Sequence, residues 1–260
     1  MLSAVQVQPG DVFLEIGPGR GALTLPLAAT GAPVLAIEID RDLVAQLVTQ
    51  VPANVTVLSG DILNVDPLPF LAGMAPQQTV EQKAPGVPRR FRVVGNLPYN
   101  LSTPLLFWLI DLHRRHGFFA NATVMLQREV ADRLVAKAGT KAYGVLTVLM
   151  GLHATIERVL DLPPTAFRPA PKVRSAVVRL TFGPPSVRIA DEVLFERLLK
   201  TIFSQRRKTL ANALKPFDVT APAVLALSGI DGRRRPETLQ VEEMARLAEL
   251  FAAARRGPVV

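Results

Sequence analysis

The chain has 260 residues, of which 49% are apolar, enough for one large domain or one α/β domain with a small appendage. It lacks cysteine, which excludes disulfides and thiolate metal sites. Its three histidines show no ligand spacing, so we expect no metal. The start does not resemble a signal peptide and no apolar run is long enough to span a bilayer, so we expect a cytoplasmic protein without membrane contact. The net charge of +8 is compatible with a polyanionic partner but is weak evidence alone.

Short apolar runs alternate with helical patterns along the first half of the chain. The expected strands cover 12–16, 34–37, 55–58, 92–94 and 123–126, and helices are expected over 22–29 and 42–50. This alternation predicts an α/β fold, a doubly wound and mostly parallel Rossmann-like sheet with helices on both faces. Later runs at 155–160 and 175–182 are expected to form an antiparallel edge.

Proline-rich segments interrupt this pattern twice. Residues 67–90 contain many prolines and are predicted to form a long surface loop. The segment Gly183-Pro184-Pro185 ends the α/β pattern, and helical stretches follow at 192–203, 207–214, 222–227 and 242–254. We therefore expect a catalytic α/β domain over 1–183 and a small all-helical domain over 186–260.

A glycine-rich loop, Glu15-Ile16-Gly17-Pro18-Gly19-Arg20-Gly21, follows the first strand. Glycines permit a sharp turn and the close approach of a ligand, and the next helix offers free amide hydrogens at its N-terminus. A dinucleotide site favours the spacing G-x-G-x-x-G. The spacing here is G-x-G-x-G with an acidic residue two positions before it, which is typical of S-adenosylmethionine sites and disfavours a nicotinamide oxidoreductase.

Acidic residues end three successive strands. Glu15 can face the cationic methionine end of the cofactor, Glu38 can accept both hydrogen bonds of a ribose diol, and Asp61 can accept one from the adenine amine. Ligands bind at the carboxyl ends of such strands, which makes this combination more specific than any single glycine turn. The predicted S-adenosylmethionine site consists of Glu15, Gly17, Gly19, Glu38, Ile39, Asp61, Ile62 and Asn96.

The segment Gly95-Asn96-Leu97-Pro98-Tyr99-Asn100 after the fourth strand is the most specific local signal. The adenine amine is a poor nucleophile because its lone pair is delocalised, and acceptors placed at its hydrogens favour the pyramidal form that attacks a methyl group. The Asn96 side chain and the Leu97 carbonyl can be these acceptors, with Pro98 fixing the turn. Tyr99 offers a face for a flipped-out base. The alternative is a structural turn with a core tyrosine.

A second aromatic residue, Phe167, lies in the proline-rich stretch 163–173. Such a stiff loop before an edge strand can place Phe167 against the target base, on the side opposite Tyr99. A loop anchor packed in the core explains the same residue equally well.

With these motifs, the chain resembles the bacterial small-subunit ribosomal RNA adenine dimethyltransferases over nearly its whole length. The resemblance rests on 15–24, 60–61, 96–99, 167–175, 203–210 and 229–239. It implies methylation of two adjacent adenosines near the 3′ end of small-subunit rRNA during late subunit assembly. It also implies that Gly17, Glu38 and Asp61 hold the cofactor and that Asn96 and Tyr99 serve the target base.

The N-terminal residues depart from the family pattern. Only residues 1–11 precede the first strand, and the family's Gly-Gln-x-Phe-Leu motif is not among them. In the family that segment helps to close the site over cofactor and target. We therefore expect the sequence as given to be impaired relative to an N-terminally extended form, and equal methyl transfer by both forms would contradict this.

Basic residues are concentrated in the last third of the chain. Such clusters neutralise RNA phosphates, although a solvated helix face is the common explanation of a charge run, and some of the arginines can instead brace packing. The candidate RNA-binding residues are Lys200, Arg206, Arg207, Lys208, Arg233, Arg234 and Arg235.

Two other functions fit the same scaffold. A resistance-type methyltransferase of large-subunit rRNA shares the glycine loop and the Asn-x-Pro-Tyr turn, but the basic segment 203–210 argues against it. A non-enzymatic RNA-binding factor is disfavoured by the intact turn at 96–99. We expect a monomer whose partner is the small ribosomal subunit rRNA.

Overall fold

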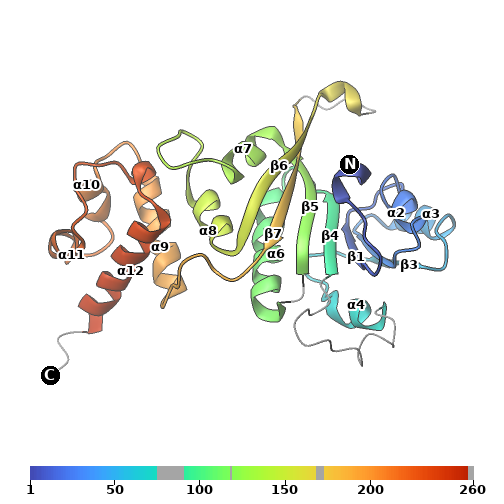
Figure 1. Ribbon diagram of the computed structural model, residues 1–260, viewed down its shortest axis with the longest axis horizontal. Helices are drawn as coiled ribbons and strands as arrows, with labels where there is room; N and C mark the ends of the chain where they lie inside the picture. Colours follow the sequence, from blue (N-terminus) through green and yellow to red (C-terminus); the bar gives the residue numbers. More distant parts are fainter. Residues whose placement is uncertain (75–90, 118, 168–172, 257–260) are drawn as a thin grey trace. The chain divides into compact units, whose positions relative to one another are not determined.

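The computed structural model describes residues 1–74, 91–117, 119–167 and 173–256 (Figure 1). The chain divides into two compact units. Unit 1 comprises Met1–Ala131 and Thr155–Phe182, and unit 2 comprises Asp132–Ala154 and Gly183–Val260. Residues 132–154, which the sequence pattern assigns to the α/β domain, fall in unit 2, where Tyr143, Val148 and Leu152 join its apolar core.

A seven-stranded sheet of order β3-β2-β1-β4-β5-β7-β6 forms the centre of unit 1 (Figure 1). The predicted doubly wound, mostly parallel sheet is thereby confirmed, because β1 to β5 pair in parallel and β7 runs antiparallel to β5. The strands are β1 (Phe13–Ile16), β2 (Val34–Glu38), β3 (Val55–Ser59), β4 (Phe91–Asn96), β5 (Phe119–Gln127), β6 (Ala154–Leu162) and β7 (Ser175–Phe182).

Helices connect these strands. They are α1 (Leu2–Val5), α2 (Thr24–Ala28), α3 (Arg41–Val48), α4 (Leu68–Met74), α6 (Ser102–His116), α7 (Arg128–Leu134) and the 3₁₀ turn η1 (Pro164–Ala166). Helix α4 corrects part of the expected loop 67–90, because prolines are tolerated in a first helical turn and Asp66 accepts the Leu68 N–H there. Residues 75–90 lie outside the described chain.

The order of the strands reverses between β1 and β4. From β1 to β3 the chain moves toward one edge of the sheet, and from β4 to β5 it moves toward the other. Right-handed crossovers therefore place α2 and α3 on one face and α6 on the opposite face. Such a reversal opens a crevice at the carboxyl ends of the two central strands, which is where ligands bind in this class of sheet.

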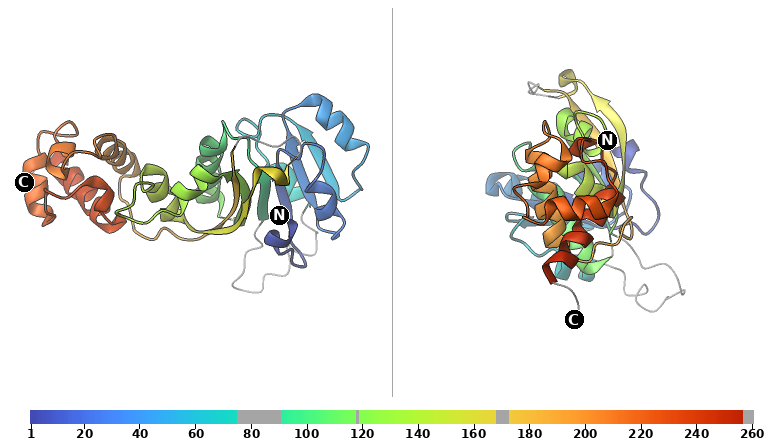
Figure 2. Two further views of the ribbon diagram at one scale, coloured as in Figure 1. Left: turned by 90° about the horizontal axis from the view of Figure 1, so that it is seen from above. Right: turned by 90° about the vertical axis from the view of Figure 1, so that its left-hand side faces the viewer.

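Unit 2 is helical, and Figure 2 shows its last four α-helices in orange and red. Its core is built from buried apolar side chains of all its α-helices. The expected helix over 207–214 begins only at Leu210, because the Lys208 N–H closes a turn onto the Gln205 carbonyl at 2.7 Å. The elements are α8 (Val145–His153), α9 (Glu192–Ser204), α10 (Leu210–Leu214), α11 (Ala221–Ser228), the 3₁₀ turn η2 (Pro236–Thr238) and α12 (Val241–Arg256).

Candidate active site

The glycine loop after β1 adopts a conformation that favours glycine. Gly17 and Gly19 have φ angles of 66° and 57°, in the left-handed region that residues with a Cβ rarely occupy. The Gly17 N–H donates to the Ile37 carbonyl at 3.0 Å, so the loop begins as a continuation of the β1–β2 ladder. The loop is therefore held at the carboxyl end of the sheet, and its Gly21 N–H closes a turn onto the Pro18 carbonyl at 2.9 Å.

Gly95 sets the close approach of β1 and β4. A Cβ built there would lie 2.6 Å from the Ile16 carbonyl oxygen, a backbone atom that cannot move aside without shifting β1. The same approach brings the glycine loop to the Asn96 turn, since a Cβ on Gly17 would lie 3.9 Å from the Asn96 carbonyl oxygen. The two sequence motifs thus meet at the point where the strand order reverses.

Glu38 is buried at the end of β2, and backbone amides surround its carboxylate. Oε2 accepts from the Gly19 N–H at 3.0 Å, and Oε1 accepts from Ile39 and Asp40 at 2.9 and 3.1 Å. A carboxylate offers about four lone-pair sites, so capacity remains for a ligand hydroxyl. The sequence predicts only that Glu38 binds a ribose diol. In the structure its carboxylate also holds the glycine loop, through the Gly19 N–H.

Asp61 is held in a fixed orientation after β3. Its Oδ1 accepts from the Leu63 N–H at 3.0 Å and its Oδ2 from the Asn64 side chain at 2.8 Å. The neighbouring isoleucines differ: Ile62 is buried, whereas the side chain of Ile39 is 65% exposed. An exposed isoleucine beside two oriented carboxylates provides an apolar surface of the kind an adenine ring covers.

Glu15 is a buried acid on the sheet face that carries Glu38. It is 2% exposed, and its Oε2 has no hydrogen-bond partner among the described residues. Burial raises the pKa of Glu15 to about 7; the Thr24 hydroxyl lowers it in part, and the nearby Glu38 charge raises it further. An unsatisfied buried carboxyl oxygen beside the glycine loop is suited to receive a cationic group.

The Asn96 turn has a firmly held backbone. The Leu97 N–H donates to the Met125 carbonyl at 3.1 Å, and the Pro98 carbonyl accepts from both the Leu101 N–H and the Ser102 hydroxyl at 3.0 Å. Asn96 itself is exposed, which leaves its amide oxygen accessible to a substrate. The half-buried Tyr99 places its hydroxyl 3.0 Å from the Ser175 Oγ. No motif in the sequence predicts this contact.

Phe167 packs on the sheet face that carries Asn96. It contacts a small apolar cluster around Met125 and Val177, and Met125 is the register partner of Asn96 in β4. In paired parallel strands, register partners point to the same face, so Phe167 and Asn96 share it. Phe167 is thus a partial loop anchor that lies near the turn, and residues 168–172 of its loop are outside the described chain.

The two basic segments of unit 2 are brought together by backbone hydrogen bonds. The Leu210 N–H donates to the Arg234 carbonyl at 2.7 Å, and the Ala211 N–H donates to Gly232 at 3.0 Å. These bonds place the segment 206–208 beside the segment 233–235. The predicted set is not uniform, however. Arg234 forms an ion pair with Glu243, and Lys200 pairs with Glu196 at 2.6 Å.

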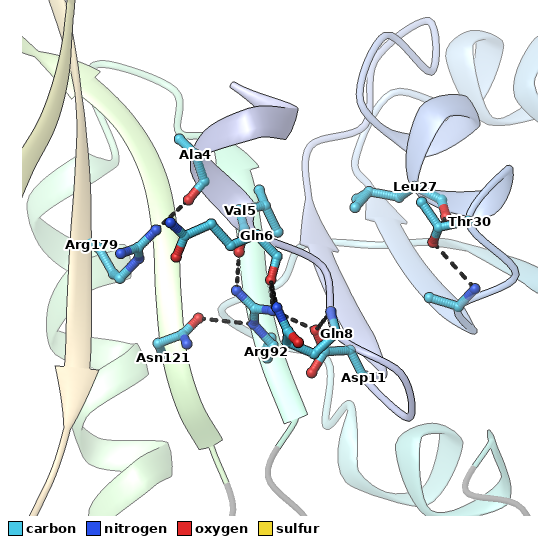
Figure 3. A network of polar contacts seen from close by, with 11 residues as sticks. Ala4, Val5, Gln6, Gln8, Asp11, Leu27, Thr30, Arg92, Asn121 and Arg179 are labelled. Carbon is cyan, nitrogen blue, oxygen red and sulfur yellow. Dashed lines mark hydrogen bonds and ion pairs between the residues drawn. The ribbon is translucent and has the colours of Figure 1, made fainter.

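Sequence reasoning missed the polar network under the N-terminal segment. Arg92 in β4 is buried and donates to the carbonyls of Val5 and Gln6, to Asp11 and to Asn121 (Figure 3). Arg179 in β7 similarly donates to the Ala4 carbonyl. The two arginines hold residues 4–11 across the sheet face. An arginine within an otherwise apolar strand was the signal available in the sequence.

Among the described residues, no helix is long and apolar enough to cross a membrane. No group of three or more His, Cys, Asp or Glu side chains in these parts of the chain has the arrangement of a metal site.

Comparisons with known proteins place this geometry in context. A family described as ribosomal RNA adenine dimethylase matches residues 1–253. A protein named ribosomal RNA small subunit methyltransferase A from Chromobacterium violaceum is 43% identical over 250 residues, which cover 95% of this chain and 87% of that protein. The protein of the same name from Nitrosococcus oceani is 42% identical over 257 residues, covering 98% and 90%.

Solved structures show the same fold. A dimethyladenosine transferase from Plasmodium falciparum superposes with a TM-score of 0.72 at 23% identity, covering 97% of this chain and 94% of that one. The 23S rRNA methyltransferase ErmE gives a TM-score of 0.64 at 24% identity, covering 96% and 95%.

Proposed function

Because the chain belongs to the ribosomal RNA adenine dimethylase family, we propose that it methylates the N6 amines of two adjacent adenosines near the 3′ end of small-subunit rRNA during ribosome assembly. The methyl donor is S-adenosylmethionine. The name shared by the curated relatives supports the small rather than the large subunit as substrate. The likeness to the large-subunit enzyme is one of fold, at 24% identity.

The observation that carries the proposal is the exposed Asn96 at the strand reversal. Bound S-adenosylmethionine supplies an electrophilic methyl group on a positively charged sulfur. The Asn96 side-chain oxygen and the Leu97 carbonyl accept the two amine hydrogens, which returns the nitrogen lone pair to the attacking direction. Tyr99 supports the base by stacking, and Phe167 on the same sheet face covers it from the other side. The nitrogen becomes cationic as it takes the methyl group and then releases one proton to water, so the transfer needs no strong general base.

The residues around the glycine loop fit the cofactor. The unsatisfied Glu15 Oε2 is suited to the methionine ammonium, and Glu38 retains lone pairs for a ribose hydroxyl. Gly17 and Gly19 keep side chains out of the cofactor's path. Asp61 would accept a hydrogen bond from the adenine amine, and Ile39 and Ile62 would provide the apolar surface for the adenine ring. All of these residues belong to unit 1 of one chain, which supports a monomer as the active form.

Unit 2 supplies the RNA contacts in this proposal. Arg206, Arg207 and Lys208 lie in a turn that backbone hydrogen bonds join to the loop of Arg233 and Arg235. This gathers cations from two segments on one side of the unit, as a phosphate backbone requires. Arg234 contributes less, because Glu243 holds it in a partly buried pair, whereas the pairs of Lys200 with Glu196 and of Arg233 with Asp231 are exposed and leave both cations accessible. The substrate places the enzyme in the cytoplasm with the assembling ribosome.

Transfer of labelled methyl groups to small ribosomal subunits that lack the modification tests the proposal. We expect label on adenosines of the small subunit, little on large subunits, and a loss of about 100-fold or more in kcat for Asn96→Ala. Asn54→Ala is the matched control, because the Asn54 amide bonds the Ala28 and Ala32 carbonyls at 3.0 and 2.9 Å, at the other end of the strands. Label confined to large subunits, or unchanged activity of Asn96→Ala, would overturn the proposal.

A further inference from the structure

Tyr99 and Ser175 are joined by a hydrogen bond between elements that lie 76 residues apart in the chain. The Tyr99 hydroxyl oxygen lies 3.0 Å from the Ser175 Oγ. Tyr99 is in the turn that follows β4, and Ser175 is the first residue of β7. The contact therefore links the turn proposed to serve the target base with the strand that follows the Phe167 loop.

The Ser175 end of this contact is rigid. Ser175 is fully buried and pairs in register with Gln127 at the end of β5. One residue further out, the Arg128 N–H donates to the Arg174 carbonyl at 3.0 Å, which extends the pairing beyond both strands. The sheet therefore fixes the Ser175 backbone and Cβ, which leaves the hydroxyl only the rotation about its first side-chain torsion.

At the Tyr99 end of the contact, the turn holds only the backbone. Hydrogen bonds to the Pro98 carbonyl from Leu101 and Ser102 fix the turn itself. The ring can still rotate about two side-chain torsions, and it is half-buried. The hydroxyl oxygen lies on the axis of the second torsion, so a hydrogen bond there restricts the first torsion, which sets where the ring lies. The hydroxyl is therefore the group through which the position of the ring is set.

We propose that Ser175 is a positioning residue for methyl transfer, which holds the Tyr99 ring at the position where the target adenine stacks. The inference rests on the proposed function, because it takes Tyr99 as the surface that receives the base. A displaced ring lets the adenine tilt, and its amine then leaves the line of attack. Errors of about 1 Å in such alignment can cost up to about 100-fold in rate. Removal of one hydroxyl should cost about 10-fold.

A double-mutant cycle tests this role. Ser175→Ala, Tyr99→Phe and the double variant are compared with wild type for kcat and KM on undermethylated small subunits. Affinity for S-adenosylhomocysteine and the thermal midpoint are measured beside them. We expect each single variant to lower kcat about 10-fold and the double variant to lower it no further, because both remove the same contact. Cofactor affinity should stay within about twofold of wild type.

Ser228→Ala is the control for the general effect of removing a buried serine hydroxyl. The Ser228 hydroxyl donates to the Leu225 carbonyl at 2.7 Å and accepts from the Ile230 N–H at 3.1 Å, within unit 2. We expect Ser228→Ala to lower the thermal midpoint without lowering kcat. A Ser175→Ala variant that behaves in the same way has only a structural role, and the inference fails. Multiplicative losses in the double variant would also overturn it.

The outcome is separable from that of the proposed function. If Asn96→Ala abolishes transfer while Ser175→Ala leaves kcat unchanged, the function stands and only the positioning role is lost. If Tyr99→Ala abolishes transfer but Tyr99→Phe does not, the stacking surface stands and its hydroxyl is irrelevant. Absence of label from the wild-type enzyme would refute the function, and the inference with it.

Discussion

Glu38 Oε2 accepts a hydrogen bond from the Gly19 N–H at 3.0 Å, so the acid at the end of β2 fastens the glycine loop after β1. The same carboxylate binds two further backbone amides through Oε1. The side chain that we propose to bind the cofactor therefore also holds the glycine loop in place.

Glu38→Gln should weaken both the cofactor contact and the loop contact of this side chain and leave the rest of the fold intact. Its amide NH₂ cannot accept a hydrogen bond, so either the loop contact or the Ile39 and Asp40 contacts must break. We expect affinity for S-adenosylhomocysteine to fall at least about 10-fold by titration calorimetry, because a ribose acceptor is lost and the loop is released. Asp40→Ala is the control: it removes the α3 N-cap and about 1 kcal/mol of stability. Wild-type affinity in Glu38→Gln would contradict the assignment.

The buried carboxyl of Glu15 should make stability depend on pH. Its pKa is raised from an ordinary value of 4.5 to about 7 in the folded chain. The native state then holds a proton that the unfolded state releases between these values, so the contribution of Glu15 to stability is full below pH 4.5 and is lost as pH rises toward 7. The full effect is up to about 3 kcal/mol.

Glu15→Gln should abolish that dependence. The neutral amide has no ionised form to desolvate, so the variant should be more stable than wild type above pH 7 and similar near pH 5. Chemical unfolding followed by the fluorescence of Trp108, the single tryptophan, reports on unit 1 and can be repeated across this pH range. Parallel stability curves for the variant and wild type would show that Glu15 is ionised throughout.

How far the sequence predicts this molecule depends on how local the signals are. The parallel strands were located within a few residues, because each is a short apolar run bounded by glycine or polar residues. The glycine loop and the Asn96 turn were found because each motif is contiguous. The sequence does not predict contacts between distant residues. Arg92 and Asp11 lie 81 residues apart, and Tyr99 and Ser175 lie 76 residues apart. No residue in either pair signals its partner.

Arg92→Met should strongly destabilise unit 1. The Arg92 side chain is 7% exposed and pairs with Asp11, which is 14% exposed, while it also satisfies two carbonyls of the N-terminal segment. Removal of one partner leaves a buried charge uncompensated, which costs about 3–5 kcal/mol. Arg115→Ala is the control, because the Arg115–Asp111 pair is 59% and 51% exposed and contributes less than about 1 kcal/mol. Urea unfolding measured by Trp108 fluorescence compares both; equal losses would refute the burial argument.

Arg233 and Arg234 are adjacent in sequence, but their mutation should affect different properties: RNA binding for Arg233 and the stability of unit 2 for Arg234. The Arg233 side chain is 91% exposed and pairs with the exposed Asp231 at 3.2 Å. Arg234 donates to Glu243 Oε2 at 3.0 Å and to the Thr238 carbonyl at 2.8 Å, so it ties η2 to α12. We expect Arg233→Ala to weaken RNA binding and to reduce the slope of log affinity against log salt by about 1.

Arg234→Ala should instead lower the stability of unit 2 by about 1–3 kcal/mol in calorimetry, because it leaves Glu243 without its charged partner. The pKa of Glu243 is held below its usual range chiefly by this hydrogen bond from Arg234, so the stabilising contact is present at neutral pH and is lost as the carboxylate is protonated at low pH. At neutral pH and matched temperature, its salt slope should remain that of wild type. A reduced slope in Arg234→Ala, with stability unchanged, would mean that this arginine leaves Glu243 to bind phosphate.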